Sequence, residues 1–179
     1  MRYVASRHPD TLVIGVDANA DALRDASRRF AAKPARGGLP NALLARLALA
    51  DAPGELAGLV DRLTVLLPWG SLLHAVARPE VAALVALRGL CKPGAEIRVL
   101  FGYGPAADGA AMRDLALPSL DDAATLGALE RAYRDAGFAA TASRVTRGEV
   151  RELPTTWAKK LAYSGHERLF VELVGAEKA

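Results

Sequence analysis

Residues 63–73, LTVLLPWGSLL, are the stretch from which the fold is best approached. The apolar run at 63–67 is typical of a buried β-strand, and Pro68 ends it. Trp69 follows at once, then a glycine and a serine. Loops after strands are usually small and polar, so the largest aromatic side chain at this position needs an explanation.

Strands alternate with helices on both sides of this stretch. The strand-like segments are 11–19, 42–49, 62–67, 92–102, 138–145 and 167–175, and the helical ones are 2–7, 20–32, 71–90 and 119–138. Ser119 is the expected N-cap and Gly137 the expected C-cap of the last helix. The pattern predicts an α/β fold with a mostly parallel sheet. The two final strands resemble the antiparallel hairpin of a class I methyltransferase sheet, although a dinucleotide-binding fold would give much the same pattern.

Length and composition indicate one domain, residues 1–179, in which 51% of residues are hydrophobic. The formal net charge of +3 permits an anionic partner without requiring one. A single cysteine, Cys91, excludes an intrachain disulfide and favours a reducing compartment. No apolar segment reaches the roughly 20 residues of a membrane span, and the start lacks the apolar core of a signal peptide. We therefore expect a cytoplasmic protein that does not contact a membrane.

Two acidic residues end apolar stretches. Asp17 follows the first strand, at the sheet edge where open α/β folds bind ligands, and could accept both hydroxyls of an adenosine ribose. The alternative is a helix cap, although Asn19 would serve better as one. Asp51 could receive an adenine amino group or could be a solvated turn residue.

Other motifs are weaker. Residues 101–109, FGYGPAADG, contain Gly-x-Gly, but the third glycine is misplaced for a dinucleotide-binding turn, so a loop is the preferred interpretation. Three histidines without a Cys/His cluster predict no metal site. The absence of G-x-S-x-G argues against an α/β-hydrolase.

Two groups of basic residues are either solvated faces or a nucleic-acid surface. The second group surrounds Trp157, and an aromatic ring among cations is a common way to hold a base beside its phosphates. The groups are Arg28, Arg29, Lys33 and Arg36, then Arg144, Arg147, Arg151, Lys159, Lys160 and Arg168.

Three segments together resemble the kanamycin–apramycin resistance methyltransferases: AAKPARGGLPN (31–41), LLPWGSLL (66–73) and PTTWAKKL (154–161). The similarity extends over residues 5–175. It implies a Rossmann-like class I fold with S-adenosylmethionine as cofactor. It also implies methylation of N1 of adenine 1408 in the 16S rRNA of the 30S subunit, aminoglycoside resistance, and a monomer.

The resemblance assigns roles to the aromatic residues and to the loop. Trp69 and Trp157 would cover the two faces of a flipped adenine, while Leu67 and Pro68 offer backbone carbonyls to its amino group. Judged without the resemblance, Trp69 would be a core aromatic and Trp157 a linker anchor.

The resemblance also assigns cofactor and RNA contacts. Asp51 is one carbon shorter than the expected glutamate, and His166 replaces a frequent arginine. The implied cofactor contacts are Asp17, Ala50, Asp51, Thr155 and Thr156. The implied rRNA contacts, expected to form one continuous surface, are Arg28, Lys33, Arg36, Lys159, Lys160 and Arg168.

One departure from the family is large. Its glycine-rich cofactor loop and first strand should precede RYVASRHP, yet Met1 stands directly before this segment. We expect strands 11–17 and 62–67 to be left with unpaired edges, and a truncated or misassigned start is the resulting hypothesis. A catalytically impaired rRNA-binding or cofactor-binding remnant, or a small-molecule methyltransferase, is the alternative.

Overall fold

The structure is a computed structural model that describes residues 1–178. It divides into two compact units, Met1–Ala52 and the chain from Pro53 onward, each treated separately below. Strands and helices alternate through both, which confirms the predicted α/β class. The single domain expected over residues 1–179 stays a prediction.

The first unit is built on two parallel strands, β1 (Val13–Asp17) and β2 (Ala42–Arg46), paired from Val13↔Ala42 to Asp17↔Arg46. Its helices are α1 (Arg2–Arg7) and α2 (Ala20–Phe30), with short 3-10 turns η1 (Pro34–Arg36) and η2 (Leu49–Asp51).

Side-chain caps fix the connections of the first unit. Asn19 caps α2 by accepting the Asp21 N–H at 3.0 Å. The amide nitrogen of Asn41 lies within 3.0 Å of the carbonyl oxygens of Ala5, His8 and Thr11, and so ties the loop before β1 to the start of β2. Short polar side chains thus replace backbone partners where the chain turns.

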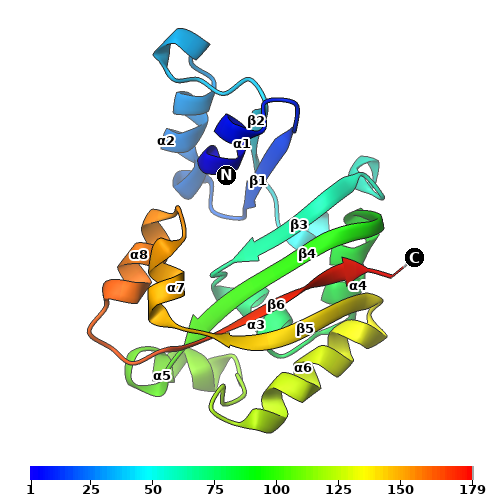
Figure 1. The fold of residues 1–179 in the computed structure, drawn as a ribbon, viewed down its shortest axis with the longest axis vertical. Coiled ribbons are helices and arrows are strands. Elements are labelled where there is room, and N and C mark those ends of the chain that lie inside the picture. Colours follow the sequence, from blue (N-terminus) through cyan, green and yellow to red (C-terminus); the bar gives the residue numbers. More distant parts are fainter. Residues whose placement is uncertain (179) are drawn as a thin grey trace. The chain divides into compact units, whose positions relative to one another are not determined.

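The second unit holds a four-stranded sheet in the order β3-β4-β6-β5 (Figure 1). Its strands are β3 (Val60–Leu66), β4 (Cys91–Tyr103), β5 (Phe138–Val145) and β6 (Leu169–Glu177). β3 and β4 are parallel, whereas β6 is antiparallel to both β4 and β5. The predicted C-terminal antiparallel hairpin is confirmed. The mostly parallel sheet is wrong for this unit, because two of its three strand pairings are antiparallel. β1 belongs to the two-stranded sheet of the first unit, and β3 belongs to the four-stranded sheet of the second. The unpaired edges expected for these strands stay a prediction.

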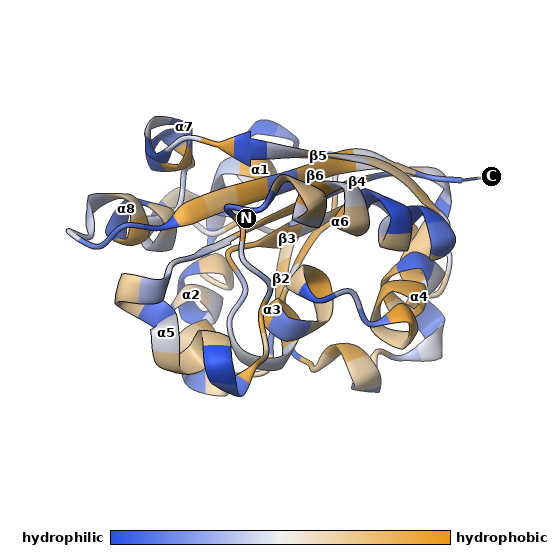
Figure 2. Ribbon diagram, turned by 90° about the horizontal axis from the view of Figure 1, so that it is seen from below, coloured by the Kyte–Doolittle hydropathy of each residue, from blue (hydrophilic) through white to orange (hydrophobic). Residues whose placement is uncertain are grey.

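Helices α3, α4 and α6 lie on one side of this sheet (Figure 2). Ile97, Val99 and Phe101 share one face of β4 by alternation and are buried. The helices of the unit are α3 (Gly70–Ala77), α4 (Val81–Leu90), α5 (Pro105–Asp114), α6 (Ala123–Asp135), α7 (Arg147–Glu152) and α8 (Thr156–Tyr163), with a 3-10 turn η3 (Gly54–Leu56). Alternation along β4 sends Leu100 to the other face, where α7 and α8 pack.

The single helix expected over residues 71–90 is wrong. The chain forms α3 and α4, bent by 98° at a break that contains Pro79. Proline removes a backbone donor and clashes with the preceding turn, while both halves are apolar enough to look continuous in sequence. Among residues 1–178 no single helix is long and apolar enough to cross a bilayer; only this bent pair meets the length and composition criteria.

Two other boundaries differ from expectation. The Pro-Gly turn predicted at the start of β4 is an irregularity within the strand, because the register shifts between Val60↔Cys91 and Arg62↔Glu96. Asp122, not Ser119, caps α6 by accepting the Ala124 N–H at 2.8 Å. Gly137 follows the end of this helix with φ +93°, as its predicted C-terminal role requires.

Candidate functional site

Trp69 stands in the connection between β3 and α3. Leu67, directly after the strand, adopts a left-handed backbone with φ +49° and donates its N–H to the Leu100 carbonyl at 2.7 Å. A left-handed conformation costs a residue other than glycine about 1–2 kcal/mol and is unusual before a proline. Strain of this kind is concentrated at functional sites. The turn leaves Trp69 at the N-cap of α3 with 51% of its surface exposed.

Trp157 stands in the connection between β5 and β6, which the sequence predicted as a linker and which contains α7 and α8. It is the second residue of α8 and is 44% exposed. Thr155 caps this helix by accepting the Ala158 N–H at 3.0 Å. The ammonium of Lys160 lies 5.5 Å from the centre of the Trp157 ring, a cation–π distance.

Helix α7 starts with a capping box. Thr146 accepts the Glu149 N–H, and the Glu149 carboxylate accepts the Thr146 N–H at 2.8 Å and its hydroxyl at 2.6 Å. These hydrogen bonds, the side-chain one foremost, lower the pKa of Glu149. The T-x-x-E spacing was visible in the sequence and could have predicted this helix.

One buried cluster lies beneath both tryptophan-bearing segments. Its members are Leu67, Leu100, Val150, Ala158 and Phe170. Figure 1 shows α7 and α8 beside the ends of β3 and β4. Trp69 and Trp157 are thus anchored at the same end of the sheet, and neither is a buried core aromatic. Their stacking role, like that of the Leu67 and Pro68 carbonyls, stays a prediction.

The predicted cofactor residues fall in both units. Asp17 is exposed at the carboxyl end of β1, and its Oδ1 accepts the Asn19 N–H at 2.8 Å. Asn19 caps α2, as the sequence suggested, so the cap does not require Asp17. Ala50 and Asp51 are exposed in η2.

In the second unit, the Thr155 hydroxyl already accepts a hydrogen bond but keeps its proton to donate, and Thr156 is exposed. A common cofactor site for these residues and those of the first unit stays a prediction.

The predicted rRNA contacts differ in availability. Arg28, Lys33 and Arg36 are exposed in the first unit, and Lys159 and Lys160 are exposed on α8. Whether they form one continuous surface stays a prediction.

Arg168 is different, because its side chain is only 11% exposed and forms a bidentate ion pair with Asp108 at 2.8 and 2.9 Å. It also donates to Ser164 Oγ at 2.6 Å. A phosphate contact from this guanidinium stays a prediction and would use the donor capacity that these bonds leave.

The Gly-x-Gly of residues 102–104 serves close packing. A Cβ at Gly102 would strike the Phe170 ring, and one at Gly104 would strike the Glu167 carbonyl. The Gly104 N–H donates to the Asp108 carboxylate at 3.0 Å. These glycines let β6 approach β4. The loop preferred for residues 101–109 is wrong, because β4 continues to Tyr103 and α5 begins at Pro105.

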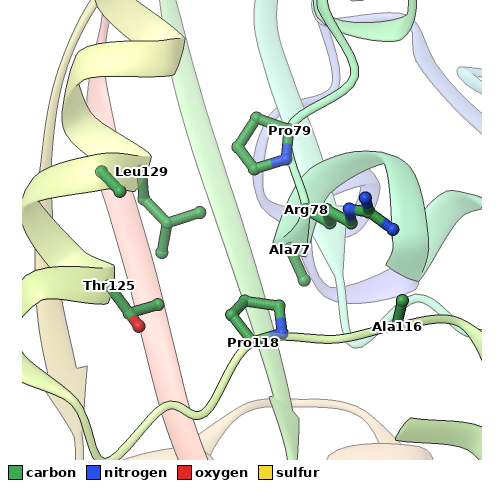
Figure 3. Close-up of a pocket in the computed structure, with 8 residues that line it drawn as sticks. Ala77, Arg78, Pro79, Ala116, Pro118, Thr125 and Leu129 are labelled. Carbon is green, nitrogen blue, oxygen red and sulfur yellow. The ribbon is translucent and has the colours of Figure 1, made fainter. Parts of the chain in front are cut away.

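A pocket of about 260 Å³ lies on the helical side of the sheet (Figure 3). Thr125 and Leu129 of α6 face Pro79 and Arg78 across it. Its lining residues are Ala77, Arg78, Pro79, Ala116, Pro118, Thr125, Ala128 and Leu129. Neither tryptophan contributes to it, so it is separate from the predicted base site. Within residues 1–178, no group of three or more His, Cys, Asp or Glu side chains comes together as a metal site would require.

Sequence reasoning missed Asp108 and the cluster residues Val150 and Phe170. Asp108 is 60 positions from Arg168, and no local pattern reveals a pair at that distance. Ala158 and Leu161 have helical spacing on α8, which was a usable signal for its buried face.

Comparison with known proteins identifies the family of this chain. A sequence model of the NpmA family, 16S rRNA (adenine(1408)-N(1))-methyltransferase, matches residues 1–176. The enzyme of that name from Streptoalloteichus hindustanus is 35% identical over 162 residues, which cover 88% of this chain and 73% of the relative.

Two solved structures are similar over nearly the whole chain. The aminoglycoside resistance methyltransferase NpmB1 is 38% identical with a TM-score of 0.78, covering 97% of this chain and 80% of NpmB1. A tryptophan-to-alanine mutant of the 16S rRNA (adenine(1408)-N(1))-methyltransferase from Catenulisporales acidiphilia, with cosubstrate SAM, is 28% identical. Its TM-score is 0.83, with 99% of this chain and 80% of that chain covered. Since the family match spans nearly all of the sequence and the fold agrees, the chain belongs to the NpmA family of 16S rRNA (adenine(1408)-N(1))-methyltransferases.

Proposed function

We propose that this chain transfers a methyl group from S-adenosylmethionine to N1 of adenine 1408 in the 16S rRNA of the 30S subunit, and so confers aminoglycoside resistance. The observation that carries the proposal is the pair of exposed indoles, Trp69 and Trp157, anchored on one buried cluster in a chain of this family. Both rings are about half exposed, so each has surface available for stacking on a ligand. A flipped base stacked between two such rings would use this surface.

The residues of this chain act by positioning. S-adenosylmethionine, when bound, supplies an electrophilic methyl on its sulfonium, and the adenine N1 lone pair can attack it without a strong general base. Trp69 and Trp157 hold the base, and the carbonyls of Leu67 and Pro68 accept hydrogen bonds from its amino group. Orientation of this kind can supply much of the rate acceleration of a reaction between two bound molecules. Two indoles also favour the cationic product, by about 1 kcal/mol each.

The donor set suits the adenosine part of the cofactor. Asp17 presents an exposed carboxylate at the carboxyl end of a parallel strand, where a ribose would bind. Its Oδ1 accepts the backbone N–H of Asn19, and the carboxylate has further lone pairs for the ribose hydroxyls. Asp51 is exposed for an adenine amino group, and Thr155 and Thr156 add hydroxyls.

The basic residues suit the rRNA. Lys159 and Lys160 lie within three positions of Trp157 on α8, so a phosphate they bind would be near a base stacked on that ring. Their exposure leaves both ammonium groups open to the RNA backbone. The assembled 30S subunit is the proposed partner, and the protein is proposed to act on it as a cytoplasmic monomer.

Binding experiments separate this proposal from its alternatives. The chain is titrated by calorimetry with S-adenosylmethionine, alone and in the presence of purified 30S subunits. The proposal expects saturable binding of both. Binding of 30S without the cofactor indicates an rRNA-binding remnant, and binding of the cofactor without 30S indicates a cofactor-binding remnant or a small-molecule methyltransferase.

A further inference from the structure

Leu67 takes part in two structural features at once. Its backbone is left-handed, with φ +49°, immediately before Pro68. The N–H donates to the Leu100 carbonyl at 2.7 Å, which fixes the residue to the end of β4. The chain then leaves the sheet, and Trp69, two residues later, is the N-cap of α3.

The Leu67 side chain, in contrast, faces the opposite segment. It is 6% exposed and belongs to the cluster with Val150 of α7 and Ala158 of α8. Ala158 directly follows Trp157 in the sequence. Leu67 therefore packs its side chain beneath the helix that carries Trp157, while its backbone directs the chain toward Trp69.

Packing and strain are consequently linked. A residue other than glycine keeps a left-handed backbone only when its surroundings enforce it, and here the buried side chain and the Leu100 hydrogen bond do so. Well-packed interiors transmit displacements instead of absorbing them. We propose that Leu67 is a positioning residue that couples the two indoles, so that loosening the α7–α8 packing also displaces Trp69. The inference rests on the proposed function only in regarding the two indoles as one site.

A fluorescence experiment tests the coupling without any turnover. Trp157→Phe leaves Trp69 as the only tryptophan, because the chain has two. Val150→Ala is then added on α7, and Val171→Ala serves as the matched control. Both valines are 0% exposed, but Val171 lies on β6 outside the cluster.

The coupling predicts that Val150→Ala changes the emission maximum of Trp69 and its acrylamide quenching, whereas Val171→Ala leaves both unchanged. Equal changes in the two variants, or none in Val150→Ala, overturn the proposal. Leu153→Ala, on the partly buried rim of the cluster, repeats the test if Val150→Ala melts below the assay temperature.

Kinetics with both tryptophans present provide the second arm. Val150→Ala should lower kcat about tenfold with KM for 30S changed less than about twofold, since misplacement affects the reacting geometry more than docking. Val171→Ala should leave both kcat and KM unchanged even where it lowers the melting temperature as much as Val150→Ala does. Altered Trp69 fluorescence in a chain that never methylates 30S supports the coupling and contradicts the proposed function. Normal methylation with unaltered fluorescence in Val150→Ala contradicts the coupling alone.

Discussion

Arg168 and Asp108 form a buried bidentate ion pair that joins the residue before β6 to the first turns of α5. Their side chains are only 11% and 5% exposed. The Asp108 carboxylate also accepts the Gly104 N–H, and Arg168 also donates to Ser164. The network holds the end of β4 and the end of the α7–α8 segment against the start of β6.

Removing Asp108 should therefore destabilise the protein strongly. Asp108→Ala leaves the Arg168 guanidinium buried without its partner, and breaking a buried pair in this way costs about 3–5 kcal/mol. Urea unfolding measures the free energy. The control is Glu96→Ala, which breaks the exposed Arg62–Glu96 pair and should cost less than about 1 kcal/mol. Equal losses of unfolding free energy in both variants would show that burial does not make the Asp108–Arg168 pair more important for stability than an exposed pair.

Replacing either indole should impair catalysis far more than folding. Trp157→Ala removes one stacking surface worth about 1–3 kcal/mol, so kcat/KM for 30S should fall about 5- to 150-fold. The free energy of unfolding should change by less than about 1 kcal/mol because the ring is 44% exposed. Trp157→Phe keeps a stacking ring and should retain much of the activity. Severe unfolding of Trp157→Ala would instead identify the ring as a structural anchor.

Salt dependence should distinguish phosphate contacts from other lysines. Lys159→Ala should weaken 30S binding and lower the slope of log K against log salt by about 1. Lys92 is the matched control, because it is at the other end of β4 in an ion pair with Asp61 at 2.7 Å. Filter binding at several salt concentrations gives both slopes. The same slope for Lys159→Ala and the unaltered chain would exclude a phosphate contact at Lys159.

Alkaline pH should destabilise the second unit through its buried tyrosines. Burial raises the pKa of both Tyr103 and Tyr133, and Tyr103 donates to the Pro118 carbonyl at 2.8 Å. The unfolded chain releases these protons near pH 10, whereas the folded protein retains them. Their contribution is thus fully present below about pH 10 and is lost as pH rises toward the folded pKa values. Urea midpoints between pH 8 and 11 should fall less steeply in Tyr133→Phe; an unchanged slope would contradict this origin.

Local patterns predicted the elements whose causes are local. The strand before Pro68, the cap at Asn19 and the final antiparallel hairpin follow from apolar runs, short polar side chains and glycine positions. The break at Pro79 was missed because apolar residues on both sides conceal the bend.

The candidate site was predictable only in part. The resemblance pointed to Trp69 and Trp157, and the structure shows both exposed. The sequence grouped Arg168 with the exposed basic residues, although its guanidinium is paired with a carboxylate 60 positions away. The left-handed Leu67 and its contact with α7 and α8 depend on tertiary packing, which no sequence period encodes.

Methyl transfer itself tests the account most directly. The chain is incubated with labelled S-adenosylmethionine and purified 30S subunits, and the 16S rRNA is then read by primer extension. A methyl on N1 blocks Watson–Crick pairing and should stop reverse transcription at adenine 1408. The account predicts label in the rRNA and this stop, both lost in Trp69→Ala. Absence of label and stop with the unaltered chain, at protein in excess over 30S, would contradict it.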